Sequence, residues 1–153
     1  DYIAPLLALG HSIGRIGCLL VGDDYGRPSN LPWAISFENG LPPSTVENIT
    51  SMGYQFSNSL PFNTVCHVHP TQIYECVLYF IIFLYLRYLF KHKDFNGEIF
   101  FNYLFLVGFS RFLVEFLRLN PKYYFNLSGA QYISIIMILL ASISLYRFRQ
   151  KKV

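Results

Sequence analysis

Charged residues are scarce in this sequence. Asp, Glu, Lys and Arg make up 14 % of the 153 residues, against about 25 % in an average soluble domain. So few charges cannot cover the surface of a water-soluble protein of this size. The net charge is only +3, and the basic residues stand beside apolar stretches rather than on a polar face. This composition excludes an ordinary soluble domain and gives no reason to expect binding to nucleic acid.

Cysteine is also rare. The sequence has Cys18, Cys66 and Cys76, and no Cys-x-x-Cys pair. An odd number of widely spaced cysteines predicts neither a disulfide framework nor a zinc site. Cys66 stands close to His67 and His69, which keeps a metal site open as a minor alternative, although the spacing is not that of a zinc knuckle. We therefore expect no metal site.

Apolar residues are abundant instead, at 53 % of the chain, and aromatic residues reach 18 %. Four stretches approach the roughly 20 residues that cross a bilayer core, namely residues 2–21, 73–90, 98–117 and 131–146. A loop region rich in Pro, Ser, Asn and Gly, residues 23–72, separates the first two, and residues 31–37 could form a short strand in it. The sequence thus predicts an all-α membrane protein with about four transmembrane helices and one long loop region.

The basic residues predict how these helices are oriented. One basic cluster follows the second apolar stretch and another follows the fourth: Arg87, Lys91 and Lys93, then Arg147, Arg149, Lys151 and Lys152. Cytoplasmic loops carry an excess of Lys and Arg. We therefore expect a cytoplasmic C-terminus and an extracytoplasmic loop region. Because the chain starts with Asp rather than Met, we also expect it to be a piece of a longer product, directed to the membrane by its apolar stretches.

Arg15, Arg111 and Glu115 interrupt the apolar stretches, and a charge at mid-membrane is costly, by about 2.5–3.5 kcal/mol. Arg111 and Glu115 are four residues apart, so they share a helix face that Arg118 continues. The spacing fits a structural ion pair and an anion site equally well. Arg15 follows His11 by one helical turn. Two arginines in the outer half of the membrane favour a shared anion, and the most available one is the phosphate of a phospholipid head group.

A third polar group lies where the loop region meets the second apolar stretch, in the sequence His-Pro-Thr-Gln-Ile-Tyr-Glu of residues 69–75. Thr71 is the expected N-cap of that helix. A helix start does not explain why His69, Gln72, Tyr74 and Glu75 gather there. We expect them at the same membrane level as the two arginines.

Together these stretches resemble the prolipoprotein diacylglyceryl transferase family of bacterial membrane enzymes. The matching segments are, in order, DYIAP, GRIGCLLVGDDYGRP, HPTQIYE, GFSRFLVEFLR and QYIS. The resemblance implies that the chain is the C-terminal part, about four helices, of a seven-helix fold in the bacterial cytoplasmic membrane. It also implies transfer of the diacylglyceryl group of phosphatidylglycerol to the lipobox cysteine thiol of a prolipoprotein. The products would be a thioether and glycerol 1-phosphate, formed without a cofactor.

The resemblance also implies site residues. Arg15 matches the family's signature arginine, and Arg111 matches its second essential arginine. Asp23 stands where the family usually has glutamate, and Gly26 matches the glycine that closes the signature.

The implied reaction displaces a phosphate ester from a glycerol carbon, so charge grows on the leaving group. We expect Arg15 and Arg111 to stabilise that charge and Glu115 to orient Arg111. His69 and His11 are candidate bases for the substrate thiol. Further contacts to the substrate or to the arginines are expected from Asp23, Gln72, Tyr74 and Glu75.

Two departures from the family pattern keep an alternative open. Cys18 and Val21 replace asparagines of the signature, and the family's N-terminal part with its His-Gly-Gly loop does not match this chain. The alternative is a non-catalytic phospholipid-binding membrane module, or an inactive fragment of such an enzyme. A fragment of a channel or transporter is a more remote third class.

Overall fold

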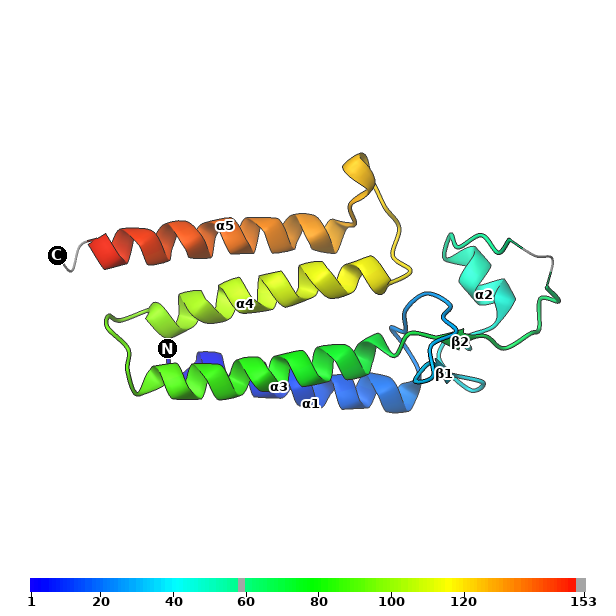
Figure 1. The fold of residues 1–153 in the computed structure, drawn as a ribbon, viewed down its shortest axis with the longest axis horizontal. Helices are drawn as coiled ribbons and strands as arrows, with labels where there is room; N and C mark the ends of the chain where they lie inside the picture. The colour runs from blue at the N-terminus through cyan, green and yellow to red at the C-terminus, as the bar shows by residue number, and fades with distance from the viewer. Residues whose placement is uncertain (58–59, 151–153) are drawn as a thin grey trace.

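The computed structural model describes residues 1–57 and 60–150. Its long helices are α1 (Ile3–Val21), α3 (Thr71–Phe90), α4 (Glu98–Val114) and α5 (Gly129–Gln150). They run side by side along the long axis of the molecule (Figure 1). All four are long and apolar enough to cross a membrane, α4 together with the 3-10 turn that extends it to Leu117. The prediction of a mostly helical protein with four such helices is confirmed.

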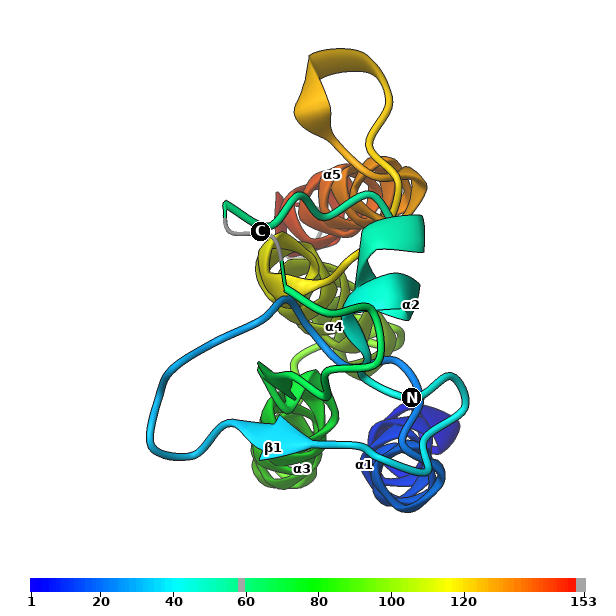
Figure 2. The same ribbon diagram turned by 90° about the vertical axis from the view of Figure 1, so that its right-hand side faces the viewer.

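The helices pack in sequence. α1 packs against α3, and α4 packs against both α3 and α5. Viewed along the bundle, α4 lies between the α1–α3 pair and α5 (Figure 2). The buried core of this bundle consists of Ala4, Ala8, Tyr79, Ile82, Leu86, Ile99, Tyr103 and Val107. Large apolar side chains such as Leu20, Leu84 and Ile136 point outward, as expected for helices that contact lipid.

The loop region gathers beyond one end of the bundle, opposite the end where the chain begins and where α5 ends (Figure 1). It contains the short helix α2 (Val46–Ser51) and two strands, β1 (Ile35–Ser36) and β2 (His67–Val68), which pair antiparallel. The strand expected at residues 31–37 is limited to Ile35–Ser36. The preceding residues form a turn instead, in which Ala34 N donates to Leu31 O at 3.0 Å. A small core of Tyr25, Ile49 and Val68 holds the region together.

The first residue fixes the position of α1 along α4. The Asp1 carboxylate accepts hydrogen bonds from Gly97 N at 2.8 Å and Phe100 N at 3.2 Å, and Lys93 Nζ lies 3.6 Å from it. Amides in the first turn of a helix have no partner within the helix, and a negative charge there is favourable. The Asp of the DYIAP segment therefore anchors the start of α1 to the start of α4.

The start of α3 differs from the prediction. Helix α3 begins at Thr71, with Pro70 as its N-cap and no side-chain cap. The Thr71 hydroxyl donates instead to the Asp24 carbonyl at 2.7 Å. Thr71 therefore joins α3 to the segment that follows α1, and this contact brings residues distant in the sequence to one place.

The end of α4 tightens into the 3-10 turn η1 (Glu115–Leu117), and Arg118 then forms an isolated β-bridge with Gly26. A second 3-10 turn, η2 (Tyr124–Asn126), lies in the connection to α5. The segment after α1 thus runs between the start of α3 and the end of α4, at the end of the bundle that carries the loop region.

Candidate functional site

The carboxylate of Glu75, in the second turn of α3, is the centre of a buried charge network. Its side chain is 2 % exposed, and its Oε1 accepts from Arg111 Nη1 at 2.7 Å. Its Oε2 lies 2.6 Å from Arg15 Nε and 3.8 Å from Arg118 Nη1. One carboxylate therefore joins α1, α3 and the end of α4. The sequence predicted Glu75 only as a supporting contact, whereas the structure makes it the hub.

Asp24 is a second acidic partner of the arginines. Its Oδ2 accepts from Arg15 Nη1 at 2.9 Å, and its Oδ1 pairs with Arg118 Nη2. Burial alone would raise the pKa of Asp24, but the charges of Arg118 and Arg15 outweigh it and hold the pKa below its ordinary value. Asp24, rather than Asp23, therefore contacts Arg15, and the alternative expected contact of Asp23, with the substrate, stays a prediction. Asp23 instead accepts a 2.5 Å hydrogen bond at its backbone carbonyl from Gln72 Nε2.

Glu115 completes the network on α4. Its Oε2 lies 3.5 Å from Arg111 Nη2, which is the predicted pairing across one helical turn. Its Oε1 accepts from Asn120 Nδ2 at 2.6 Å. The side chain is 1 % exposed. Arg111 is thus held between two buried carboxylates, which fix the plane of its guanidinium.

A pocket of about 320 Å³ opens between α1, α3 and α4 on the bundle side of this network, lined by Gly10, His11, Gly14, Arg15, Cys18, Tyr79 and Arg111. No atom lies within 4 Å of the place where a Cβ on Gly10 or Gly14 would stand. The His11 ring lies 5.2 Å from the Tyr79 ring and its Nδ1 is 3.5 Å from the Tyr103 hydroxyl. Along α1 the pocket is therefore lined by His11, Cys18 and two glycines that leave room, and it is cationic at Arg15 and Arg111.

Two further pockets, of about 340 and 420 Å³, border the network on the side of the loop region. They share Met52, Arg118, Leu119, Asn120 and Pro121, and the larger one also includes Asp23 and Asp24. We call these two the outer pockets, and the pocket between α1, α3 and α4 the bundle pocket. The charge network separates the bundle pocket from the outer pockets.

His69 belongs to a row of hydrogen-bonded side chains next to the charge network. Its Nδ1 lies 3.3 Å from the Tyr74 hydroxyl, which accepts from Trp33 Nε1 at 2.7 Å. Burial and the nearby charge of Arg27 lower the pKa of His69, so the ring is neutral near pH 7. The predicted residues His69 and Tyr74 therefore meet each other, and their hydrogen bonds do not go to the arginines.

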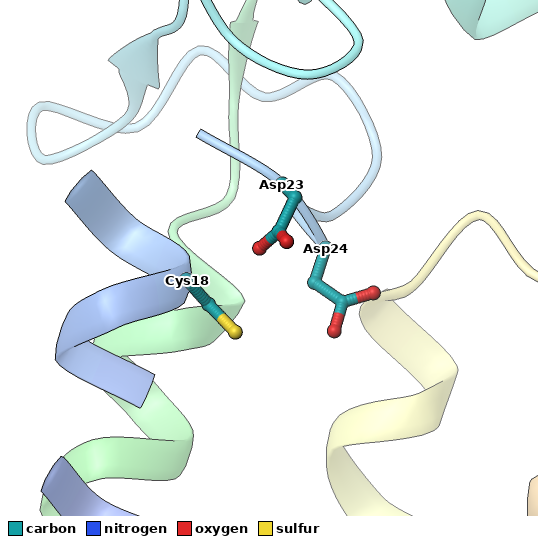
Figure 3. A group of neighbouring side chains, drawn as sticks. All are labelled: Cys18, Asp23 and Asp24. Carbon is teal, nitrogen blue, oxygen red and sulfur yellow. The ribbon is translucent and has the colours of Figure 1, made fainter. Parts of the chain in front are cut away.

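Cys18 points from α1 toward Asp23 and Asp24 (Figure 3). One ligand atom from each of these residues lies within 4.8 Å of the others, a spacing that could hold a cation. Arg15 Nη1, however, also lies 3.6 Å from Cys18 Sγ, and Asp24 is paired with two guanidinium groups. A cation would have to displace both arginine contacts, so these donors do not favour a metal.

Gly26 is required by close packing. A Cβ at this position would lie 2.7 Å from Leu117 O, 2.9 Å from His69 Cβ and 2.9 Å from Thr71 Cγ2. Gly26 N also donates to His69 O at 2.9 Å. The chain passes here between α3 and the end of α4, so the predicted site residue Gly26 shapes the network by allowing that passage.

Replacing Gly26 with alanine should lower the free energy of unfolding by about 1–3 kcal/mol, because backbone and side chains must move apart. Thermal unfolding of the protein in detergent measures this effect. The matched control is Gly17→Ala, since no atom lies within 4 Å of that Cβ position and alanine favours a helix. Equal melting temperatures for the two variants would contradict the packing role of Gly26.

Two residues of the network were not among the predicted site residues, Asp24 and Arg118. Arg118 continues the face of Arg111 and Glu115 in the sequence, which is a signal that could have found it. Asp24 adopts a left-handed conformation, with φ 58°, which turns its carboxylate rather than that of Asp23 toward Arg15. That turn leaves no pattern in the sequence, since Asp tolerates this conformation without requiring it.

Comparison with known proteins adds to this geometry. A family model described as prolipoprotein diacylglyceryl transferase matches residues 1–147. Proteins named phosphatidylglycerol–prolipoprotein diacylglyceryl transferase are 36 % identical in Finegoldia magna and 32 % identical in Clostridium tetani, each over 99 % of this chain. The match covers 51 % and 54 % of those two relatives. A third, from Bordetella parapertussis, is 34 % identical over 97 % of this chain and 50 % of its own length.

No solved structure matches the chain. The chain spans about half the length of the curated relatives it matches. The family model covers all four long helices up to the last turn of α5. On this coverage the chain belongs to the prolipoprotein diacylglyceryl transferase family.

Proposed function

We propose that this chain carries the phospholipid site of a phosphatidylglycerol:prolipoprotein diacylglyceryl transferase. The observation that supports this most is the meeting of Arg15 and Arg111 on the buried Glu75 carboxylate, at the cationic end of the bundle pocket. Arginine keeps its charge and offers a fork of donors that matches a phosphate. The remaining donors of the two guanidinium groups are the proposed phosphate site.

The arrangement of the pocket fits the order of groups in a phospholipid. The glycerol backbone of the lipid would lie beside Gly10 and Gly14 with its acyl chains extending out of the pocket, and the phosphate would lie at Arg15 and Arg111. The outer pockets would then face the extracytoplasmic side, and the C-terminus the cytoplasm of a bacterium. The acceptor in this proposal is the lipobox cysteine of a prolipoprotein.

In the proposed reaction the cysteine sulfur attacks the glycerol carbon that carries the phosphate ester. A carbon–sulfur bond forms, the carbon–oxygen bond to phosphate breaks, and the electron pair leaves with glycerol phosphate. Arg15 and Arg111 stabilise the negative charge that grows on the leaving oxygen, and Glu75 and Glu115 hold these arginines in place. The thiol proton goes to a base, because the thiolate is the stronger nucleophile.

The direct test uses the protein expressed from its own gene, vesicles of phosphatidylglycerol and a lipobox peptide. The expected result is a diacylglyceryl thioether on the cysteine peptide, with one glycerol phosphate released for each peptide modified. A peptide with serine in place of cysteine is the control. Retention of phosphatidylglycerol without any transfer would reject the enzyme and favour a non-catalytic phospholipid-binding module, the alternative that Cys18 and Val21 leave open.

His69 is the proposed base. Since its pKa is lowered, the ring stays neutral to a pH below its ordinary value of about 6.5, and the transfer rate should fall only as the pH drops below that value. His69→Gln should lower the rate by about 10²–10⁴-fold and remove this acid limb. His67→Gln, at the exposed neighbouring histidine, is the control. An unchanged pH–rate profile in His69→Gln would assign the proton to another group.

A further inference from the structure

The connection between α4 and α5 exposes three consecutive aromatic side chains. Tyr123, Tyr124 and Phe125 are 63 %, 84 % and 91 % exposed. Aromatic side chains bring a large apolar area, and an apolar patch left on a protein surface marks a place where a partner or a membrane binds. These three residues, which we call the aromatic wedge, are therefore candidates for a contact outside the described part of the chain.

Hydrogen bonds hold the aromatic wedge in a closed turn. Tyr123 N donates to Leu127 O at 2.9 Å, and Leu127 N donates to Tyr124 O at 3.2 Å. The hydroxyl of Tyr132, in the first turn of α5, donates to the same Tyr124 O at 2.5 Å. The exposed rings are thus presented by a turn that is fixed to α5.

Phe125 occupies its place at a conformational cost. Its backbone has φ 54° and ψ 25°, the left-handed region that glycine and asparagine adopt readily and that bulky side chains avoid. A ring that is 91 % exposed returns little packing energy to the fold. Strained residues persist mainly at functional sites. The strain at Phe125 therefore indicates that its ring has a role outside the fold.

The aromatic wedge lies beside the bundle rather than beyond it. In Figure 1 the loop region continues along the long axis, whereas the yellow-orange segment that contains η2 turns sideways, level with the start of α5. Figure 2 shows the same segment beyond α5, on the side away from α4. Because α4 and α5 are long and apolar enough to cross a membrane, their ends on this side lie at the membrane surface. The wedge then extends over the lipid next to α5.

The chemistry of the wedge fits the boundary between lipid head groups and acyl chains. Tyrosine is enriched at this depth, because its ring is apolar and its hydroxyl can stay in water. Lys122 precedes the wedge and is exposed, and the sequence has no Asp or Glu after Glu115. The wedge and α5 thus carry no negative charge against lipid phosphates. A stable protein partner would bury about 20–30 residues a side, far more than this turn offers.

We propose that the aromatic wedge binds the lipid surface of the leaflet on the side of the loop region. The ring of Phe125 lies among the acyl chains, and the two tyrosines lie at the head groups. The partner is the bilayer surface, not the lipid that the proposed reaction consumes. This inference is independent of the proposed function, since it uses neither the pockets nor the charge network.

Photo-cross-linking tests this contact directly. Phe125 is replaced with p-benzoylphenylalanine, which keeps an aromatic side chain, in the protein expressed from its own gene and embedded in vesicles of phosphatidylethanolamine and phosphatidylglycerol. After irradiation, mass spectrometry should find a phospholipid adduct on the peptide that contains residue 125. The matched control is the same replacement at Phe62, which is 67 % exposed in the loop region and should give no lipid adduct.

A second measurement avoids the strained position. In the same vesicles, Tyr124→Cys should react with a membrane-impermeant maleimide at least about 10-fold more slowly than Phe62→Cys, because a thiol in apolar surroundings rarely ionises. The modified peptide is identified by mass spectrometry, so the native cysteines do not interfere.

Three results would overturn the proposal. An adduct between residue 125 and a peptide of the protein would make the wedge a protein interface. Equal lipid adducts at residues 62 and 125 would show unspecific collision with lipid. Equal maleimide rates at residues 62 and 124, without a lipid adduct at 125, would place the wedge in water. None of these readouts requires diacylglyceryl transfer, so failure of the proposed function leaves the test intact.

Discussion

Replacing Arg15 or Arg111 with alanine is expected to lower the rate of diacylglyceryl transfer by about 10²–10³-fold each, and to abolish growth of a transferase-depleted bacterium that depends on the gene. The reason is that a preorganised donor aimed at developing charge is among the largest contributions to catalysis. Both guanidinium groups are already oriented by Glu75, so neither needs to reorganise as the leaving group departs. The measurements are complementation and the transfer rate to a lipobox peptide.

Replacing Arg15 or Arg111 with lysine tests whether the positive charge alone is sufficient or whether the planar guanidinium is also required. Arg15→Lys keeps the charge but loses the planar fork, so it should recover only part of the rate. Arg87→Ala, at an exposed position near the other end of α3, is the control for loss of a basic residue. Normal growth with Arg15→Ala or Arg111→Ala would refute the role assigned to that arginine.

Replacing Glu75 with glutamine is expected to have the largest effect on stability, a loss of about 3–5 kcal/mol. Removing one partner of a buried ion pair leaves the other charge uncompensated. Here the carboxylate lies 2.7 Å from Arg111 Nη1 and 2.6 Å from Arg15 Nε, so two guanidinium groups lose their common partner. The free energy of unfolding in detergent or bicelles, and the melting temperature, measure the effect.

The control for Glu75→Gln is Glu47→Gln, an exposed position in the first turn of α2, which should change stability by no more than about 0.5 kcal/mol. If Glu75→Gln were as stable as this control and as active as the wild-type protein, Glu75 could not be the hub of the network. A stable but inactive variant would instead show that the carboxylate positions the arginines without holding the fold together.

The helices were predictable because their determinants are local. Apolar stretches of sufficient length form helices in a membrane, since only a helix satisfies its own backbone groups there. The charges inside these stretches were equally visible, because Arg15 and Arg111 are conspicuous among apolar neighbours. The pairing of Arg111 with Glu115 followed from one helical turn of spacing.

The partners across helices were less predictable. The sequence predicts Thr71 as an N-cap. Its hydroxyl instead donates to the Asp24 carbonyl, because the segment after α1 passes beside the start of α3. Asp23 was expected to contact Arg15 or the substrate, but the left-handed turn at Asp24 places the Asp24 carboxylate at Arg15. Both differences come from the path of a loop, which depends on contacts between distant segments.

The sequence by itself determined that this protein has four apolar helices, that Arg15 and Arg111 interrupt two of them, and to which family the chain is similar. These properties follow from helix periodicity, hydropathy and the order of short motifs. Only the tertiary structure decided that Glu75 is the shared partner of the arginines and that Asp24 and Arg118 complete the network. The physical reason is that charge pairing acts over a few ångströms in space, and only the packing of α1, α3 and the end of α4 sets those distances.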